Sequence, residues 1–200
     1  MTENIKLHTD QRVTTMTIAR PEKRNAITQD MYAAMADALE DYARSDAVRA
    51  FVITGAEDYF TSGNDLQDFA KGTRSDGVPP VIRFLTAIST CPKPLVAAVN
   101  GPAIGVGVTM LLHCDLIIAA DTATFSTPFV PLGLVPEAAS SLLLPATVGM
   151  AVATAMLLAN RVLDAAEALR FGLVSRVAPS SGFATEVASL AAGLAQAAPS

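Results

Sequence analysis

Hydrophobic positions along the chain alternate between two spacings. Short apolar runs of strand length lie at 5–7, 13–19, 48–54, 94–99, 116–120 and 123–125, and the run at 13–19 alternates roughly with polar residues. Helix-length or helically spaced apolar segments lie between and after them, at 28–44, from about residue 65, and at 81–89, 105–112, 137–144, 147–159, 164–170 and 183–197. Thr28 is placed to cap the first helix, and 73–80 is a loop rich in glycine and proline. This alternation predicts an α/β fold with parallel strands.

Composition indicates a densely buried chain. Of the 200 residues, 51% are hydrophobic and only 16% are charged, so much of the chain is expected to lie in a core or against partner subunits. The length suits a single domain over residues 1–200. The net charge is -5 and the basic residues form no stripe, so we expect no nucleic-acid partner.

Two long uncharged runs, 94–113 and 138–160, are each long enough to span a bilayer. Prolines, glycines and polar residues interrupt both, which favours buried strands and helices joined by turns, and we expect no membrane insertion. The first ten residues lack the apolar core of a signal peptide. Cys91 and Cys114 have neither disulfide nor metal-site spacing. We therefore expect a cytoplasmic protein without a metal.

Two glycine-containing turns are candidates for binding a negatively charged oxygen. One is Ser62-Gly63-Asn64-Asp65, after the strand at 48–54, and the other runs from Asn100 to Val108 between a strand and a helix. Backbone N–H groups exposed at such turns can stabilise a developing oxyanion. Taken alone, each turn is better explained as a tight connection, the first with Asp65 as a helix cap.

Glu137 is the candidate acid–base residue. It is the only acidic residue between Asp121 and Asp164, and apolar and small residues surround it. A lone carboxylate in an apolar setting suits a general base. Pro136 predicts that Glu137 lies in the first turn of a helix, where the helix dipole favours a carboxylate. A solvated first-turn glutamate is the alternative.

The order of these segments resembles the crotonase (enoyl-CoA hydratase/isomerase) superfamily over about residues 5–198. The resemblance rests on five signals: Arg20-Pro21-Glu22-Lys23-Arg24-Asn25-Ala26, Ser62-Gly63-Asn64-Asp65-Leu66, Pro92-Lys93-Pro94 with Val99-Asn100-Gly101, Cys114-Asp115, and the segment from Ala166 to Val174. It implies a crotonase-like spiral of ββα units with C-terminal helices, whose helical part is shortened here. It also implies assembly as a homotrimer or a dimer of trimers.

The resemblance further implies an acyl-CoA thioester substrate, with coenzyme A as part of the substrate and no separate cofactor. The backbone N–H groups of Asn64 and Val106 then correspond to the family's oxyanion donors. The positions that correspond to a coenzyme A contact are Lys23, Arg24, Ser62 and Gly63.

The chain departs from the hydratases of this family at both catalytic glutamates. Thr109 and Phe129 stand at the two positions, which we assign to the acyl pocket. The segment Pro136-Glu137-Ala138-Ala139-Ser140-Ser141 instead resembles the peroxisomal-type 3,2-trans-enoyl-CoA isomerase branch, which keeps one catalytic glutamate, matched here by Glu137. The alanines at 138 and 139 replace the usual Gly-Cys and leave room for a different substrate.

The resemblance thus implies an isomerase that shifts the double bond of a 3-enoyl-CoA. Glu137 is its proton shuttle. Three alternatives stay open. Another crotonase reaction, such as hydration or thioester cleavage, requires a second acid from among Glu57, Asp58 and Asp68. A non-catalytic acyl-CoA-binding protein and a structural trimer subunit require none.

Overall fold

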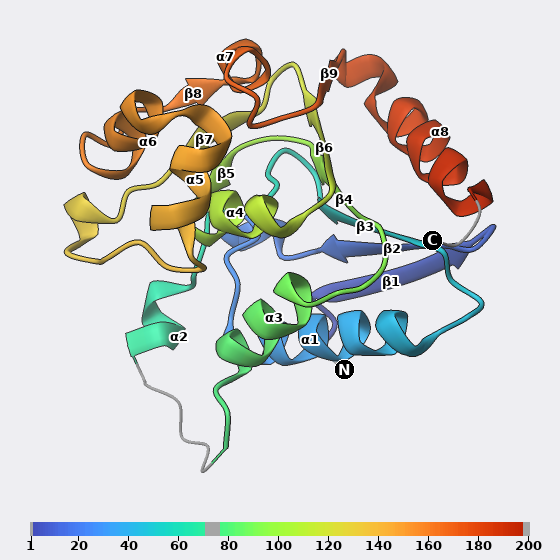
Figure 1. Cartoon of the computed structure of the whole chain (residues 1–200). Helices are drawn as coiled ribbons and strands as arrows, with labels where there is room; N and C mark the ends of the chain where they lie inside the picture. The colour runs from blue at the N-terminus through green and yellow to red at the C-terminus, as the bar shows by residue number, and fades with distance from the viewer. Residues whose placement is uncertain (1, 71–76, 198–200) are drawn as a thin grey trace.

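The computed structural model describes residues 2–70 and 77–197, so residues 73–76 of the loop expected at 73–80 lie outside the described residues. Its main sheet has six strands in the order β1-β2-β3-β4-β6-β9 (Figure 1). These strands are β1 (Ile5–Asp10), β2 (Val13–Ile18), β3 (Ala50–Gly55), β4 (Leu95–Val99), β6 (Leu116–Ala120) and β9 (Arg176–Ala178). The β1–β2 pair is antiparallel and every other pair is parallel.

Both faces of this sheet are covered. Alternate residues of β3 point to opposite sides: Phe51 and Ile53 join the main core, and Val52 joins a smaller second core. Helices α1 (Gln29–Arg44) and α3 (Pro80–Ser89) pack together on the main-core side. Helix α8 (Phe183–Gln196) packs over the other face (Figure 1). Burial on both sides explains why β4 is an unbroken apolar run.

A second, three-stranded sheet carries the loops of interest. Its strand order is β5-β7-β8, with β5 at Ala103–Ile104, β7 at Thr124–Ser126 and β8 at Leu163–Asp164. Because β5 follows β4 after only three residues, the Asn100–Pro102 turn carries the chain directly from one sheet to the other. The sequence predicted β7 nearly in place, but the short strands β5, β8 and β9 were missed.

The remaining elements are short. The α-helices are α2 (Leu66–Ala70), α4 (Val106–Thr109), α5 (Ser140–Val148), α6 (Met150–Leu157) and α7 (Ala165–Arg170). The 3-10 turns are η1 (Pro21–Lys23), η2 (Met110–His113), η3 (Val130–Leu132) and η4 (Ser180–Gly182). Thr28 caps α1 as predicted, its side chain accepting a hydrogen bond from the Met31 N–H at 3.3 Å.

Two predicted helices differ from the structure. The helix expected over 105–112 is α4 followed by the tighter turn η2, rather than one α-helix. The helix expected over 137–144 begins only at Ser140, because Ala138 and Ala139 both adopt positive φ angles, of 52° and 56°, and turn the chain before it. Glu137 therefore precedes the helix.

The predicted α/β fold with a parallel sheet is confirmed. The two uncharged runs are divided among short strands, turns and helices, as expected. Within residues 2–70 and 77–197, we find no helix with the length and apolar character that crossing a membrane requires.

Candidate active site

The two glycine-containing turns lie side by side. The Ile104 N–H donates to the Thr61 carbonyl at 3.0 Å, and the Thr61 N–H donates to the Pro102 carbonyl at 3.2 Å. Gly63 has a φ of 92°, and a Cβ at this position would lie 2.9 Å from the Ile104 carbonyl oxygen. Glycine thus permits a backbone contact that brings the segment after Gly63 next to the start of α4.

Each turn presents a backbone donor. The N–H of Ile27 bonds to the Gly63 carbonyl at 2.8 Å and the N–H of Asp65 bonds to the Ile27 carbonyl at 2.9 Å. In this parallel pairing, the N–H of Asn64 between them points away from Ile27. Across residues 2–70 and 77–197, neither the Asn64 N–H nor the Val106 N–H has a hydrogen-bond partner. Two free donors on adjoining turns can hold one negatively charged oxygen.

The Glu137 side chain contacts α4, although Glu137 itself lies in the segment just before α5. The Thr109 hydroxyl, in α4 three residues after Val106, donates to Glu137 Oε1 at 2.5 Å. Thr109 is fully buried and Glu137 is partly buried. The carboxylate is therefore held at the helix whose first N–H is one of the two free donors.

Burial raises the pKa of Glu137 above its ordinary value, and the Thr109 hydrogen bond and the charge of His113 oppose that rise. His113 itself is 3.0 Å from the Ala138 carbonyl through Nε2, so it packs against the Glu137 segment. The predicted first-turn location of Glu137 is wrong, and with it the helix-dipole argument. Desolvation is the main influence on this carboxyl group.

The residues Asn64, Val106, Thr109 and Glu137 are called the Glu137 cluster below. Tyr32 also belongs to this cluster, although the sequence did not indicate it. Its side chain is fully buried in α1, and its hydroxyl donates to Asn64 Oδ1 at 2.5 Å. Burial, and secondly the negative charge of Glu137, raise the pKa of Tyr32 well above its ordinary value. The only sequence signal was a tyrosine on the apolar face of α1, which is typical of any packed helix.

The basic loop lies against the first turn. The Ser62 N–H donates to the Arg24 carbonyl at 3.0 Å, and the Ser62 hydroxyl approaches the Lys23 carbonyl at 3.4 Å. Both basic side chains are exposed, with the Arg24 guanidinium 5.7 Å from the centre of the Tyr59 ring. A hollow of about 140 Å³ adjoins Arg24 and Tyr59. Lys23, Arg24, Ser62 and Gly63 thus form one neighbourhood.

The two positions that hold glutamates in the hydratases carry no carboxylate here. Thr109 contacts Glu137, and Phe129 is 5% exposed and part of the main core. Of the acids considered as a second catalytic group, Asp68 accepts the Gln29 N–H at 2.8 Å. The other two, Glu57 and Asp58, line the hollow beside Arg24.

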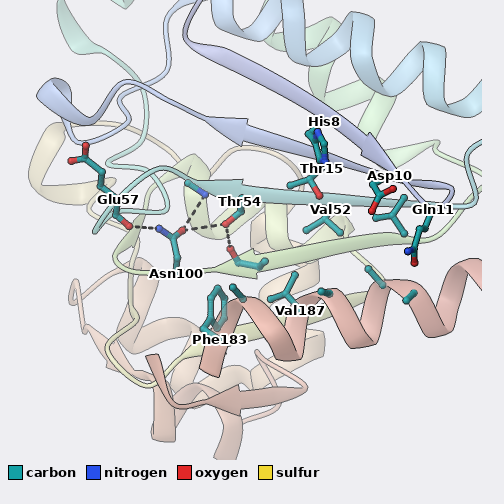
Figure 2. A pocket seen from close by; sticks show the side chains of 17 residues that line it. His8, Asp10, Gln11, Thr15, Val52, Thr54, Glu57, Asn100, Phe183 and Val187 are labelled. Atoms are coloured by element: carbon teal, nitrogen blue, oxygen red, sulfur yellow. Dashed lines mark hydrogen bonds between the residues drawn. The ribbon is translucent and has the colours of Figure 1, made fainter. Parts of the chain in front are cut away.

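A further cavity, of about 510 Å³, lies on the opposite face of the main sheet. Figure 2 shows it between α8, with Phe183 and Val187, and the sheet, with Val52 and Thr54. Glu137 does not line it, so it is separate from the Glu137 cluster. No group of three or more potential metal-ligating side chains occurs within the part of the chain that the structure describes.

Comparison with known proteins assigns the chain to a family. The enoyl-CoA hydratase/isomerase family model matches residues 8–200. The chain belongs to this family. A structure of an enoyl-CoA hydratase/isomerase from Pseudoalteromonas atlantica T6c is 51% identical, with a TM-score of 0.96, over 98% of this chain and 78% of that one. The crotonase resemblance and the crotonase-type fold inferred from the sequence are thereby confirmed.

Two similar curated members of the enoyl-CoA hydratase/isomerase family are isomerases by name. Enoyl-CoA delta isomerase 2 of Rattus norvegicus is 45% identical over 181 residues, which are 88% of this chain and 46% of that protein. Enoyl-CoA delta isomerase 3, peroxisomal, of Mus musculus is 41% identical over 191 residues, which are 92% of this chain and 60% of that protein. The chain therefore spans about half the length of these relatives.

Proposed function

We propose that the protein is an enoyl-CoA isomerase that converts a 3-enoyl-CoA into the 2-trans-enoyl-CoA. The observation that carries this proposal is the single carboxylate, Glu137, held by Thr109 beside the free N–H groups of Asn64 and Val106. Such an arrangement can remove a proton next to a thioester carbonyl while two donors stabilise the resulting enolate. The two delta isomerases among the relatives support the same reaction.

In the proposed mechanism, the thioester oxygen accepts hydrogen bonds from the backbone N–H groups of Asn64 and Val106. Glu137 removes a proton from C2, and the electron pair moves into the thioester to give a dienolate. The protonated Glu137 then returns the proton at C4, so that the double bond moves from C3–C4 to C2–C3. One proton leaves and one returns, so the reaction consumes no cofactor. Coenzyme A stays attached throughout as part of the substrate.

The residues that replace the hydratase glutamates support isomerisation over water addition. A hydratase uses a second acid to position water, whereas one carboxyl group can both take and return a proton. Thr109 holds that group in place, and Phe129, which is buried in the main core, offers no carboxylate to position water. Lys23 and Arg24, exposed beside Ser62 and Gly63, supply positive charge for the phosphates of coenzyme A.

A test of the reaction is to incubate the protein with 3-enoyl-CoA substrates of short and long chain and to follow absorbance for conjugated 2-enoyl-CoA. Conjugation is the expected result. Its absence with folded protein across all chain lengths would overturn the isomerase proposal. Parallel incubation with 2-enoyl-CoA in water separates the alternatives. Hydration would indicate the other crotonase reaction, and binding of thioesters without turnover would indicate an acyl-CoA-binding protein.

The assembly we propose is a homotrimer or a dimer of trimers. Eight of the fourteen exposed large hydrophobic side chains in the described residues lie in the single stretch 130–162, which is a suitable interface. The cytoplasmic location expected from the sequence stays a prediction.

A further inference from the structure

Tyr32 contributes its ring to the main core and its hydroxyl group to a hydrogen bond with Asn64. Tyr32 packs in the main core, its ring centre 5.4 Å from that of Phe84 in α3. A phenylalanine would fill the same space. The hydroxyl group also extends to Asn64 Oδ1 at 2.5 Å and so joins two residues that are 32 positions apart in the chain.

The other contacts of this turn hold its backbone but not the Asn64 side chain. Ile27 bonds to the residues on either side of Asn64. Asp65 is fixed by Arg20, whose guanidinium donates to Asp65 Oδ2 at 2.7 Å, and by the N–H groups of Gln67 and Asp68. Within the described residues, Tyr32 is the one hydrogen-bond partner of the Asn64 side chain.

We propose that Tyr32 is a positioning residue for the oxyanion hole, because its buried hydroxyl clamps the Asn64 side chain and so fixes the direction of the Asn64 backbone N–H. This inference rests on the proposed function, in which that N–H binds the thioester oxygen. The geometry of an oxyanion donor matters because its hydrogen bond must fit the oxygen as negative charge develops. The raised pKa of Tyr32 keeps the phenol protonated and able to donate.

The matched variants are Tyr32→Phe and Tyr42→Phe. Both tyrosines lie on the buried face of α1, and the Tyr42 hydroxyl donates to the Pro94 carbonyl at 2.8 Å, at a different place from the Glu137 cluster. Each variant removes one buried hydroxyl and keeps the ring, so both are expected to lose similar stability. Only Tyr32→Phe is expected to lower kcat, by about fivefold with little change in KM, as for one hydrogen bond acting in the transition state.

Two further measurements test whether Tyr32 affects kcat through Asn64. Asn64→Ala keeps the backbone N–H and should lower kcat to the same extent. The double variant of Tyr32→Phe and Asn64→Ala should be no slower than Asn64→Ala alone, because the two residues act as one unit. The bound probe 4-(dimethylamino)cinnamoyl-CoA absorbs at longer wavelength when its carbonyl is polarised, and this shift should be smaller in Tyr32→Phe and Asn64→Ala than in the wild type or Tyr42→Phe.

Wild-type kcat and wild-type probe absorption in Tyr32→Phe would overturn the inference, as would an equal loss in Tyr42→Phe or fully multiplicative effects in the double variant. If Tyr32→Phe does not fold, Asn64→Ala alone tests the inference. Wild-type kcat and wild-type probe absorption in Asn64→Ala would then refute the role of the Tyr32–Asn64 contact. A probe shift without turnover of any 3-enoyl-CoA would reject the isomerase proposal while leaving the role of Tyr32 standing. No shift in the wild type would refute the oxyanion hole and the clamp together.

Discussion

At the scale of single residues, the proposed reaction depends on the surroundings of Glu137. Desolvation raises its pKa, while the Thr109 hydroxyl stabilises the ionised form. A base must be deprotonated to act, so these two influences set the pH at which the proposed reaction begins. Thr109 stands at a position where the hydratases have an acid, and its hydroxyl group here lowers the pKa of Glu137.

Replacing Thr109 by valine tests this relation. Thr109→Val keeps the volume and removes the hydrogen bond that lowers the Glu137 pKa, so the pKa rises further. Activity depends on the ionised form, so the acid limb of the kcat/KM profile should move to higher pH, with the loss largest at low pH. Thr109→Ser, which keeps the hydroxyl, should keep the wild-type profile. Identical profiles for the wild type and Thr109→Val would contradict the proposed role of the hydroxyl.

The ionised form of Glu137 is required for the proposed activity, but its buried charge should lower the stability of the fold. A carboxyl group with a raised pKa in the folded state destabilises the fold once it ionises, so its cost appears as pH rises through the folded-state pKa. Glu137→Gln removes that charge. Thermal unfolding should therefore show Glu137→Gln more stable than the wild type near neutral pH, by a margin that shrinks in acid. A variant less stable than the wild type at neutral pH would contradict burial as the dominant influence.

At the scale of elements, the site depends on two turns that touch through their backbones. Gly63 makes this contact possible because of its positive φ and its closeness to the Ile104 carbonyl. Ile27 then holds the residues on either side of Asn64, and the Tyr32 hydroxyl holds the Asn64 side chain. The proposed donors are therefore properties of the pairing between segments, and changes that disturb this pairing should matter most.

Gly63→Ala tests the turn contact. An alanine at positive φ costs about 1–2 kcal/mol, and its Cβ would also meet the Ile104 oxygen at 2.9 Å. We expect a lowered midpoint of thermal unfolding and a fall in activity beyond what the stability loss explains. The control is Gly182→Ala, because a Cβ added at Gly182 would have no neighbouring atom within 4 Å and the φ angle there is negative, as is usual for any residue. Full activity in Gly63→Ala would show that the contact between the turns is dispensable.

The sequence predicted the long elements well because their apolar pattern is local. Helix α1 with its Thr28 cap and the buried strand β4 are examples. It placed Glu137 wrongly because Pro136 signals a helix start, whereas the left-handed turn at Ala138 and Ala139 postpones the helix. Neither alanine carries a sequence signal for positive φ. The Tyr32–Asn64 bond joins residues 32 positions apart and has no local signal either.

At the scale of the whole molecule, exposed apolar side chains point to assembly. Val135, Leu142 and Met150 are 80%, 72% and 69% exposed, respectively, around α5 and α6. Burying such side chains between subunits would stabilise an oligomer by about 25 cal/mol for each Å² of apolar surface removed from water.

Light scattering of the purified protein tests the assembly. A trimer would have about three times the 20.8 kDa mass of the chain, and a dimer of trimers about six times. The double change Leu142→Glu and Met150→Glu, at exposed positions, should shift the mass toward the monomer while retaining the helical circular dichroism. A monomeric wild type, or an oligomer that the double change leaves intact, would contradict an interface at α5 and α6.

The most direct test of the central claim is the rate at which Glu137→Gln converts a 3-enoyl-CoA into conjugated 2-enoyl-CoA, measured beside the wild type. The control is Glu186→Gln, an exposed glutamate on α8 paired with Arg176. Because Glu137 is proposed as the only proton shuttle, its replacement should lower kcat about a thousandfold, within the range for general acid–base catalysis, while the control keeps the wild-type rate. A Glu137→Gln protein that isomerises at the wild-type rate would contradict the account.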